Sequence, residues 1–268
     1  MGAPRRGWVG IALTVLAVGG FMFLITPIVM LIPLSIDPSP FIRFPPQGVT
    51  LHWYVEYLTT KKWIDSTILS LEVAAGASLI ATVLGTLAAI GLVRGGFAAR
   101  RAIALLLISP MLLPLVVVAI AIYGVYAALG LVGRPVGLIL AHAVLAVPFV
   151  LLNVTAALQA VPRAYEEAAM SLGAMPLVVL ARVTLPLIWR GVAAGGVFAF
   201  VISFDEVVIA MFLSSTTAIT LPKRMFDGIF YDLSPVLAAI SVILVLFNII
   251  LALTGFALAK AGRRAEAL

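Results

Sequence analysis

The sequence contains no cysteine, and only 10% of its 268 residues are charged. The absence of cysteine excludes disulfides and thiolate metal sites. Soluble domains carry roughly 25% charged residues, whereas this chain is 63% hydrophobic with a mean hydropathy of +1.22. A water-soluble fold of this length cannot bury so much apolar side chain, so the chain is predicted to lie in a lipid bilayer.

Catalytic signatures are also missing. The sequence has no G-x-x-x-x-G-K-[ST] phosphate-binding loop, no G-x-S-x-G and no H-E-x-x-H. We therefore expect no intrinsic enzymatic activity and no cofactor or metal bound by this chain itself. His52 and His142 form no ligand pattern with carboxylates, so we expect hydrogen-bonded side chains. The net charge of +6 lies in the connections between apolar stretches, and nucleic acid is not an expected partner.

Six apolar stretches are each long enough to cross a bilayer core of about 30 Å as a helix. They cover residues 9–34, 67–93, 102–129, 136–158, 190–213 and 236–259. The first follows Arg5 and Arg6, but it exceeds the roughly 7–15 apolar residues of a signal peptide and is predicted to be an uncleaved span. The expected fold is a single all-α polytopic membrane domain over residues 1–268.

The lysines and arginines of the connections are unevenly divided. Eleven of the 17 fall on one side of the predicted spans and six on the other. Because cytoplasmic loops carry the excess of such residues, both termini are predicted to be cytoplasmic. The sequence therefore predicts a multi-pass membrane protein with both ends on the cytoplasmic side.

The outward-facing connection, residues 35–66, contains the stretch LHWYVEYLTTKKW. It carries the aromatic residues Trp53, Tyr54, Tyr57 and Trp63, with polar residues between them. This pattern favours a short amphipathic helix at the membrane surface, where aromatic rings serve as anchors.

Small residues recur within the spans. Gly191 and Gly195 form a small-xxx-small pair, and Gly76, Ala81 and Gly85 give the second span small faces. Such residues let helix backbones approach closely, so they predict tight packing between helices.

The cytoplasmic connection, residues 159–189, is the most patterned polar segment of the chain. A first helix is predicted from Pro162, which suits a first helical turn, to Gly173, which suits the left-handed residue after a helix. A second helix is predicted from Pro176 until Leu185-Pro186 ends or kinks it. These signals alone leave open an ordinary amphipathic loop lying on the membrane.

This connection resembles the EAA motif of permease subunits of ABC importers, in which E-A-A precedes three residues, a glycine, nine residues and I-x-L-P. The residues that match at this spacing are Glu167, Ala168, Ala169, Gly173, Val183, Thr184, Leu185 and Pro186. Val183, where the motif has isoleucine, is the one departure. The resemblance extends over about residues 50–259 and implies a coupling helix that docks on a separate ATPase. The docking residues implied are Glu166, Glu167, Ala168, Ala169, Leu172, Gly173, Ala174, Leu185 and Pro186.

The same resemblance implies the fold and the partners. The fold would be that of a type I ABC importer permease in the bacterial cytoplasmic (inner) membrane, working by alternating access. The partners would be a second permease subunit, similar or identical, two ABC ATPase subunits that hold ATP and Mg, and an extracytoplasmic solute-binding protein, with membrane lipid around the spans. A secondary transporter that works without an ATPase remains the alternative from a different class.

Two adjacent carboxylates, Asp205 and Glu206, fall inside the fifth predicted span, in VFAFVISFDEVVIAMFL. Each costs about 2.5–3.5 kcal/mol at the centre of a membrane helix, and such groups usually mark a pathway or a binding group. We expect at least one to face the translocation pathway and attract a cation, with Ser203, Phe204 and Glu72 as further pathway candidates. An ion pair or hydrogen bond to a neighbouring helix is the alternative.

The run SFDEVVIAMFL, followed by TLPKRMFDGI and SPVLAAIS, resembles the spermidine/putrescine branch of these permeases. The resemblance implies a polyamine or a related cationic amine as the solute. Another solute, such as an amino-acid-like amine, a sugar or a metal chelate, stays open.

Overall fold

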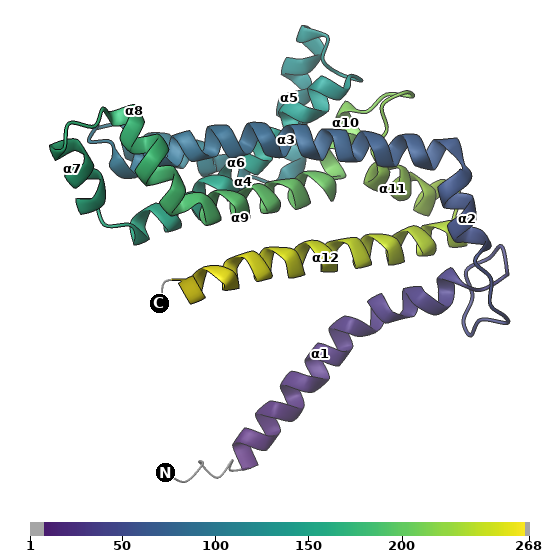
Figure 1. Cartoon of the computed structure of the whole chain (residues 1–268). Coiled ribbons are helices and arrows are strands. Elements are labelled where there is room, and N and C mark those ends of the chain that lie inside the picture. Colours follow the sequence, from purple (N-terminus) through teal and green to yellow (C-terminus); the bar gives the residue numbers. More distant parts are fainter. Residues whose placement is uncertain (1–7, 266–268) are drawn as a thin grey trace. The chain divides into compact units, whose positions relative to one another are not determined.

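The computed structural model describes residues 8–265, and every regular element in that range is a helix (Figure 1). Two compact units make up the chain, residues 1–61 with 227–247 and residues 62–226 with 248–268. Arg5 and Arg6, which entered the prediction of membrane sidedness, lie outside the described residues.

The larger unit contains the elements that carry the predicted sites. In chain order these are α3 (Lys61–Arg94), α4 (Arg100–Leu112), α5 (Leu115–Leu129), α6 (Pro135–Ala160), α7 (Ala164–Ser171), α8 (Pro176–Val179), the π-helical turn η1 (Leu180–Thr184), α9 (Leu185–Phe204), α10 (Val208–Leu213) and the first part of α11 (Leu221–Tyr231).

Glycines allow α3 and α9 to pack closely on α6, as their spacing predicted. A Cβ atom added at Gly85 of α3 would lie 2.7 Å from the Val150 Cβ atom of α6. One added at Gly195 of α9 would lie 3.1 Å from the Val150 Cα atom. Val150 is fully buried, so both neighbouring helices reach it only because these glycines lack side chains.

By length and composition, four helices of residues 8–265 can cross a membrane, or five if α4 and α5 count as one broken span. The predicted stretch 102–129 is not one straight helix, because α4 and α5 meet at an angle of 107°. Pro114 lies at this break and explains it. The proline ring disfavours helical backbone at Leu113, and Pro114 has no N–H to donate. The last predicted stretch lies in α12 (Pro235–Ala265), whose described apolar part is Pro235–Leu251.

Cations assigned to opposite sides of the membrane lie at opposite ends of α3. Near its start, the Arg224 guanidinium donates a hydrogen bond to the Ser66 hydroxyl. At its end, the Arg163 guanidinium donates to the Arg94 carbonyl. Within the larger unit, hydrogen bonds thus hold these two guanidinium groups at the two ends of one membrane helix.

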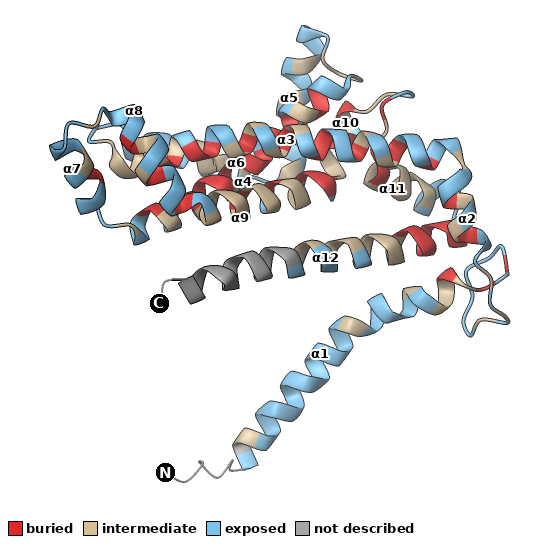
Figure 2. Ribbon diagram, in the orientation of Figure 1, coloured by how far each residue is buried: buried red, intermediate tan, exposed pale blue. Residues whose placement is uncertain are grey.

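The smaller unit contains α1 (Trp8–Ser35), α2 (His52–Thr59) and the first part of α12. The apolar helix α1 is almost entirely exposed (Figure 2), as expected of a helix surrounded by lipid. Helix α2 confirms the short helix predicted in the outer segment. Two of its aromatic side chains, Trp53 and Tyr57, are nevertheless buried, so they pack inside the protein and do not serve as surface anchors.

Asp37 organises the loop between α1 and α2. Its buried carboxylate accepts hydrogen bonds from the Arg43 side chain at 2.8 Å and from the Gln47 N–H at 3.2 Å. Its carbonyl accepts one from the Trp53 ring N–H at 2.7 Å. The hydrogen bond from Arg43 holds the pKa of the Asp37 carboxyl below its ordinary value, because it stabilises the charged form.

Candidate functional site

The connection over residues 159–189 forms the first helix and the turn that its sequence predicted. Helix α7 covers Ala164–Ser171, and Gly173 has a φ of +88°, in the left-handed region that glycine adopts without a steric cost. Pro176 then begins α8. This part of the prediction is confirmed.

The second helix does not end at Leu185-Pro186. Helix α8, the turn η1 and α9 form one continuous helical stretch, Pro176–Phe204. Pro186 has no N–H for the helical ladder, and the wider turn before it brings the Leu185 N–H to the Leu180 carbonyl, five residues back. The proline is thus accommodated by a π-helical turn, and the connection leads directly into the membrane helix.

The two adjacent glutamates of α7 point to different surroundings. Glu166 is only 9% exposed, and its carboxylate lies 3.0 Å from the Arg94 Nε atom and accepts the Thr184 hydroxyl at 2.9 Å. Glu167 is exposed. The predicted docking role of Glu166 therefore disagrees with its burial in this ion pair. Glu167 is the glutamate that remains open to a docking partner.

The other predicted docking residues mostly lie at the surface. Leu172 is 90% exposed, and Met175 and Leu177 beside it are also largely exposed. The remaining exposed members of the predicted set are Ala168, Gly173, Leu185 and Pro186, while Ala169 and Ala174 are half-buried. The loop thus presents a slim apolar surface beside one carboxylate.

Asp205 and Glu206 lie in a helix break, not within a continuous span. Helix α9 ends at Phe204 and α10 begins at Val208, which corrects the predicted uninterrupted helix over 190–213. The break gives the two carboxylates separate surroundings that helical geometry alone did not predict.

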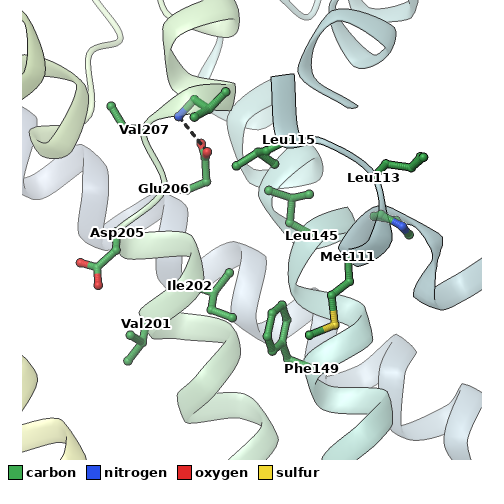
Figure 3. Close-up of a pocket in the computed structure, with 12 residues that line it drawn as sticks. Met111, Leu113, Leu115, Leu145, Phe149, Val201, Ile202, Asp205, Glu206 and Val207 are labelled. Atoms are coloured by element: carbon green, nitrogen blue, oxygen red, sulfur yellow. Dashed lines mark hydrogen bonds between the residues drawn. The ribbon is translucent and has the colours of Figure 1, made fainter. Parts of the chain in front are cut away.

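The Glu206 carboxylate is buried and accepts hydrogen bonds from the backbone N–H groups at the start of α10. It accepts the backbone N–H group of Val208 at 2.8 Å, the bond that the dashed line in Figure 3 marks. It also accepts the N–H groups of Ile209 at 2.8 Å and of Ala210 at 3.3 Å. The His142 Nε2 atom lies 3.7 Å away. Since the first N–H groups of a helix have no partner within it, Glu206 serves as a cap, which agrees with the alternative of a hydrogen-bonded structural role.

Asp205 is exposed, and its carboxylate points away from Glu206 (Figure 3). The Asn248 side chain of α12 hydrogen-bonds to it. Of the two acidic residues, Asp205 is therefore the one that a mobile cation can reach.

A cavity of about 460 Å³ lies against this break. Apart from Asp205 and Glu206, its lining is apolar and comes from α4, α5, α6, α9, α10 and the breaks between α4 and α5 and between α9 and α10: Pro110, Met111, Leu113, Leu115, Leu145, Phe149, Val201, Ile202, Val207 and Val208. Figure 3 shows the Phe149 ring beside the Met111 side chain in this lining. Sequence reasoning missed Phe149, because it is one apolar residue within an apolar helix.

The remaining pathway candidates lie elsewhere. Phe204 is buried and stacks on Phe200 with ring centroids 6.0 Å apart, so it does not line the cavity. Ser203 is buried, and the His142 Nδ1 atom lies 3.0 Å from its hydroxyl and its carbonyl. His142 is thus hydrogen-bonded, as predicted. Glu72 is exposed on α3 and is not part of the cavity.

Comparison with known proteins identifies the family. Residues 81–263 match the family described as the binding-protein-dependent transport system inner membrane component. The chain belongs to this family. The match confirms the resemblance to ABC importer permeases and places this permease in an inner membrane.

Individual relatives agree with this assignment. The permease is 34% identical over 232 residues to the putrescine transport system permease protein PotI of Escherichia coli (strain K12), covering 84% of this chain and 82% of PotI. It is 29% identical over 248 residues to the spermidine/putrescine transport system permease protein PotC of the same strain, covering 90% and 93%.

A solved structure confirms the fold. A chain of a bacterial ABC transporter that imports the acidic polysaccharide alginate superposes with a TM-score of 0.74 at 18% identity, covering 95% of this chain and 97% of that one. At this identity the likeness shows the fold alone. The permease is therefore an all-helical ABC importer subunit of the branch that includes PotI and PotC.

Proposed function

We propose that this permease forms half of the translocation pathway of an ATP-driven importer of polyamines, with Asp205 as the group that attracts the cationic amine. The observation that carries the proposal is the position of Asp205, an exposed carboxylate in a helix break beside an apolar cavity. The names of the relatives PotI, a putrescine permease, and PotC, a spermidine/putrescine permease, support the same class of solute.

The chemistry of the cavity suits a polyamine. A polyamine carries ammonium groups separated by methylene chains, so it needs both an anionic partner and an apolar wall. Asp205 supplies the negative charge, and Met111 and Leu145 supply apolar surface. The Phe149 ring offers either apolar contact or a cation–π partner.

The proposed assembly follows from the family and from the exposed loop surface. An ATPase subunit docks on the surface around Glu167 and Leu172, and ATP and Mg belong to that subunit. A second permease subunit, similar or identical, completes the pathway, and a solute-binding protein docks outside. The permease itself crosses the membrane six times with both termini in the cytoplasm.

The energy that the loop must transmit can be bounded. Reversing an inward-facing to outward-facing ratio from 99:1 to 1:99 takes about 5.5 kcal/mol of differential binding. ATP-driven closure of the ATPase dimer supplies this energy by bringing the coupling helices together, and hydrolysis resets the cycle. A coupling segment that bends under load would lose part of it.

The test is ATP hydrolysis and uptake by the complex of permease, ATPase and binding protein, reconstituted in liposomes. Putrescine, spermidine, an amino acid and a sugar are compared at equal concentration. Stimulation by the two polyamines supports the proposal. Stimulation by another solute only would retain the importer and discard the polyamine, and uptake without any associated ATPase would favour a secondary transporter.

A further inference from the structure

We propose that Arg94, Glu166 and Thr184 form an internal brace that fixes the coupling helix α7 to the membrane helices. Glu166 is then a positioning residue that acts through the orientation of α7 and does not contact the ATPase. This inference rests on the proposed coupling role of the loop.

Arg94, at the end of α3, joins two other elements. Its Nε atom lies 3.2 Å from Oε1 and 3.0 Å from Oε2 of Glu166. Its terminal nitrogen donates to the Leu158 carbonyl at 3.2 Å and to the Val161 carbonyl at 2.9 Å. Carbonyls at the end of a helix have no partner within it, so Arg94 closes the end of α6 and holds α7 with the same side chain.

Thr184 adds the start of the membrane helix α9 to this brace. It is the last residue of the π-helical turn η1, it is buried, and its hydroxyl donates to Glu166 Oε1 at 2.9 Å. The Arg163 side chain, just before α7, donates to the Arg94 carbonyl. Four segments, the ends of α3 and α6, helix α7 and the turn η1, thus meet at one partly buried ion pair.

A brace is needed because α7 is short. An eight-residue helix is not stable alone in water, and a partner that pushes on its outer face would tilt it or unwind it. Hydrogen bonds between charged groups are the stronger kind, and here they connect α7 directly to helices that cross the membrane. The neighbouring Glu167 is exposed and is not part of this buried brace. The two adjacent glutamates therefore serve different tasks.

The first experiment measures solute transported per ATP hydrolysed in the reconstituted complex. We expect Glu166→Ala to assemble with the ATPase and hydrolyse ATP while this ratio falls at least five-fold. Glu166→Gln should fall less, since its amide oxygen can still accept from Arg94 and Thr184. Thr184→Val should also lower the ratio, whereas Thr155→Val, a matched loss of a half-buried hydroxyl on α6, should leave it unchanged.

The second experiment needs no transport and no ATPase. Because the sequence has no cysteine, a spin label on Leu172→Cys is the only label in the full-length permease. We expect Glu166→Ala to increase the mobility of this label and Thr155→Val to leave it unchanged.

These two readouts separate the brace from the proposed function. Wild-type ratio and wild-type label mobility in Glu166→Ala would overturn the brace. So would loss of ATPase binding with unchanged label mobility, since Glu166 would then be a docking residue. If the wild-type complex transports no polyamine, the proposed function fails, while the label mobility still decides whether the brace exists.

Discussion

Replacing Asp205 and Glu206 one at a time by their amides should separate binding from stability. Glu206 accepts three buried backbone N–H groups at the start of α10. Glutamine keeps one acceptor oxygen and turns an NH₂ group toward the others, so at least one N–H group loses its partner. An unsatisfied buried donor costs about 1–3 kcal/mol, and Glu206→Gln should lower the melting temperature by about 2–4 °C per kcal/mol.

Asp205→Asn should show the opposite behaviour. Its side chain is exposed, and surface changes are usually within about 0.5 kcal/mol, so the melting temperature should hardly change. A hydrogen bond to a charged group contributes about 1.5–3 kcal/mol, and each 1.4 kcal/mol is a factor of ten. The apparent KM for putrescine uptake should therefore rise about ten-fold or more.

The assays are tryptophan fluorescence during heating in detergent and uptake of radiolabelled putrescine into liposomes. Asp205→Glu, which keeps the charge, is the matched control for uptake. The reasoning is refuted if Asp205→Asn lowers the melting temperature while Glu206→Gln does not, or if Asp205→Asn takes up putrescine with the wild-type KM.

Three further predictions concern packing, docking and pH. Gly85→Ala should destabilise the permease by about 1–3 kcal/mol through overpacking against α6, whereas Gly91→Ala, where an added Cβ meets nothing within 4 Å, should melt like the wild type. Leu172→Asp should reduce the amount of ATPase that co-purifies with the permease without changing its melting temperature. The folded-state pKa of Asp37 is lowered, so its charge stabilises the outer loop above its ordinary pKa of about 4, and this contribution is lost as the pH falls through the folded value. Asp37→Asn should remove that contribution at every pH, which faster tryptic cleavage after Arg43 at pH 8 would show.

Structural features that depend on one residue or on near neighbours in the sequence could be predicted from the sequence. The turn at Gly173 and the start of α8 at Pro176 follow from backbone preferences that belong to glycine and proline themselves. The approach of α3 and α6 followed from the spacing of small residues such as Gly85. Pro114 itself indicates the bend, because a proline disfavours helical backbone at the residue before it. The prediction of one helix over 102–129 rested on hydropathy alone and did not include this effect.

Contacts between distant segments were not readable. Arg94 and Glu166 are 72 residues apart in the sequence, and no local pattern links the two side chains. The capping role of Glu206 had a weak local signal, since carboxylates favour the start of a helix. Uniformly apolar flanks on both sides of the break hid the point where α10 begins.

The break between α9 and α10 also affects the sign of the electrostatic potential at the cavity. Two helix ends of opposite polarity meet there, because the carbonyl end of a helix carries about half a negative charge and the N–H end about half a positive one. Glu206 neutralises the N–H end of α10 inside the protein, so the carbonyl end of α9 at Phe204 adds to the charge of Asp205. The backbone is thus a second source of negative potential, which no side-chain replacement removes, and a preference for cations over anions should persist in Asp205→Asn.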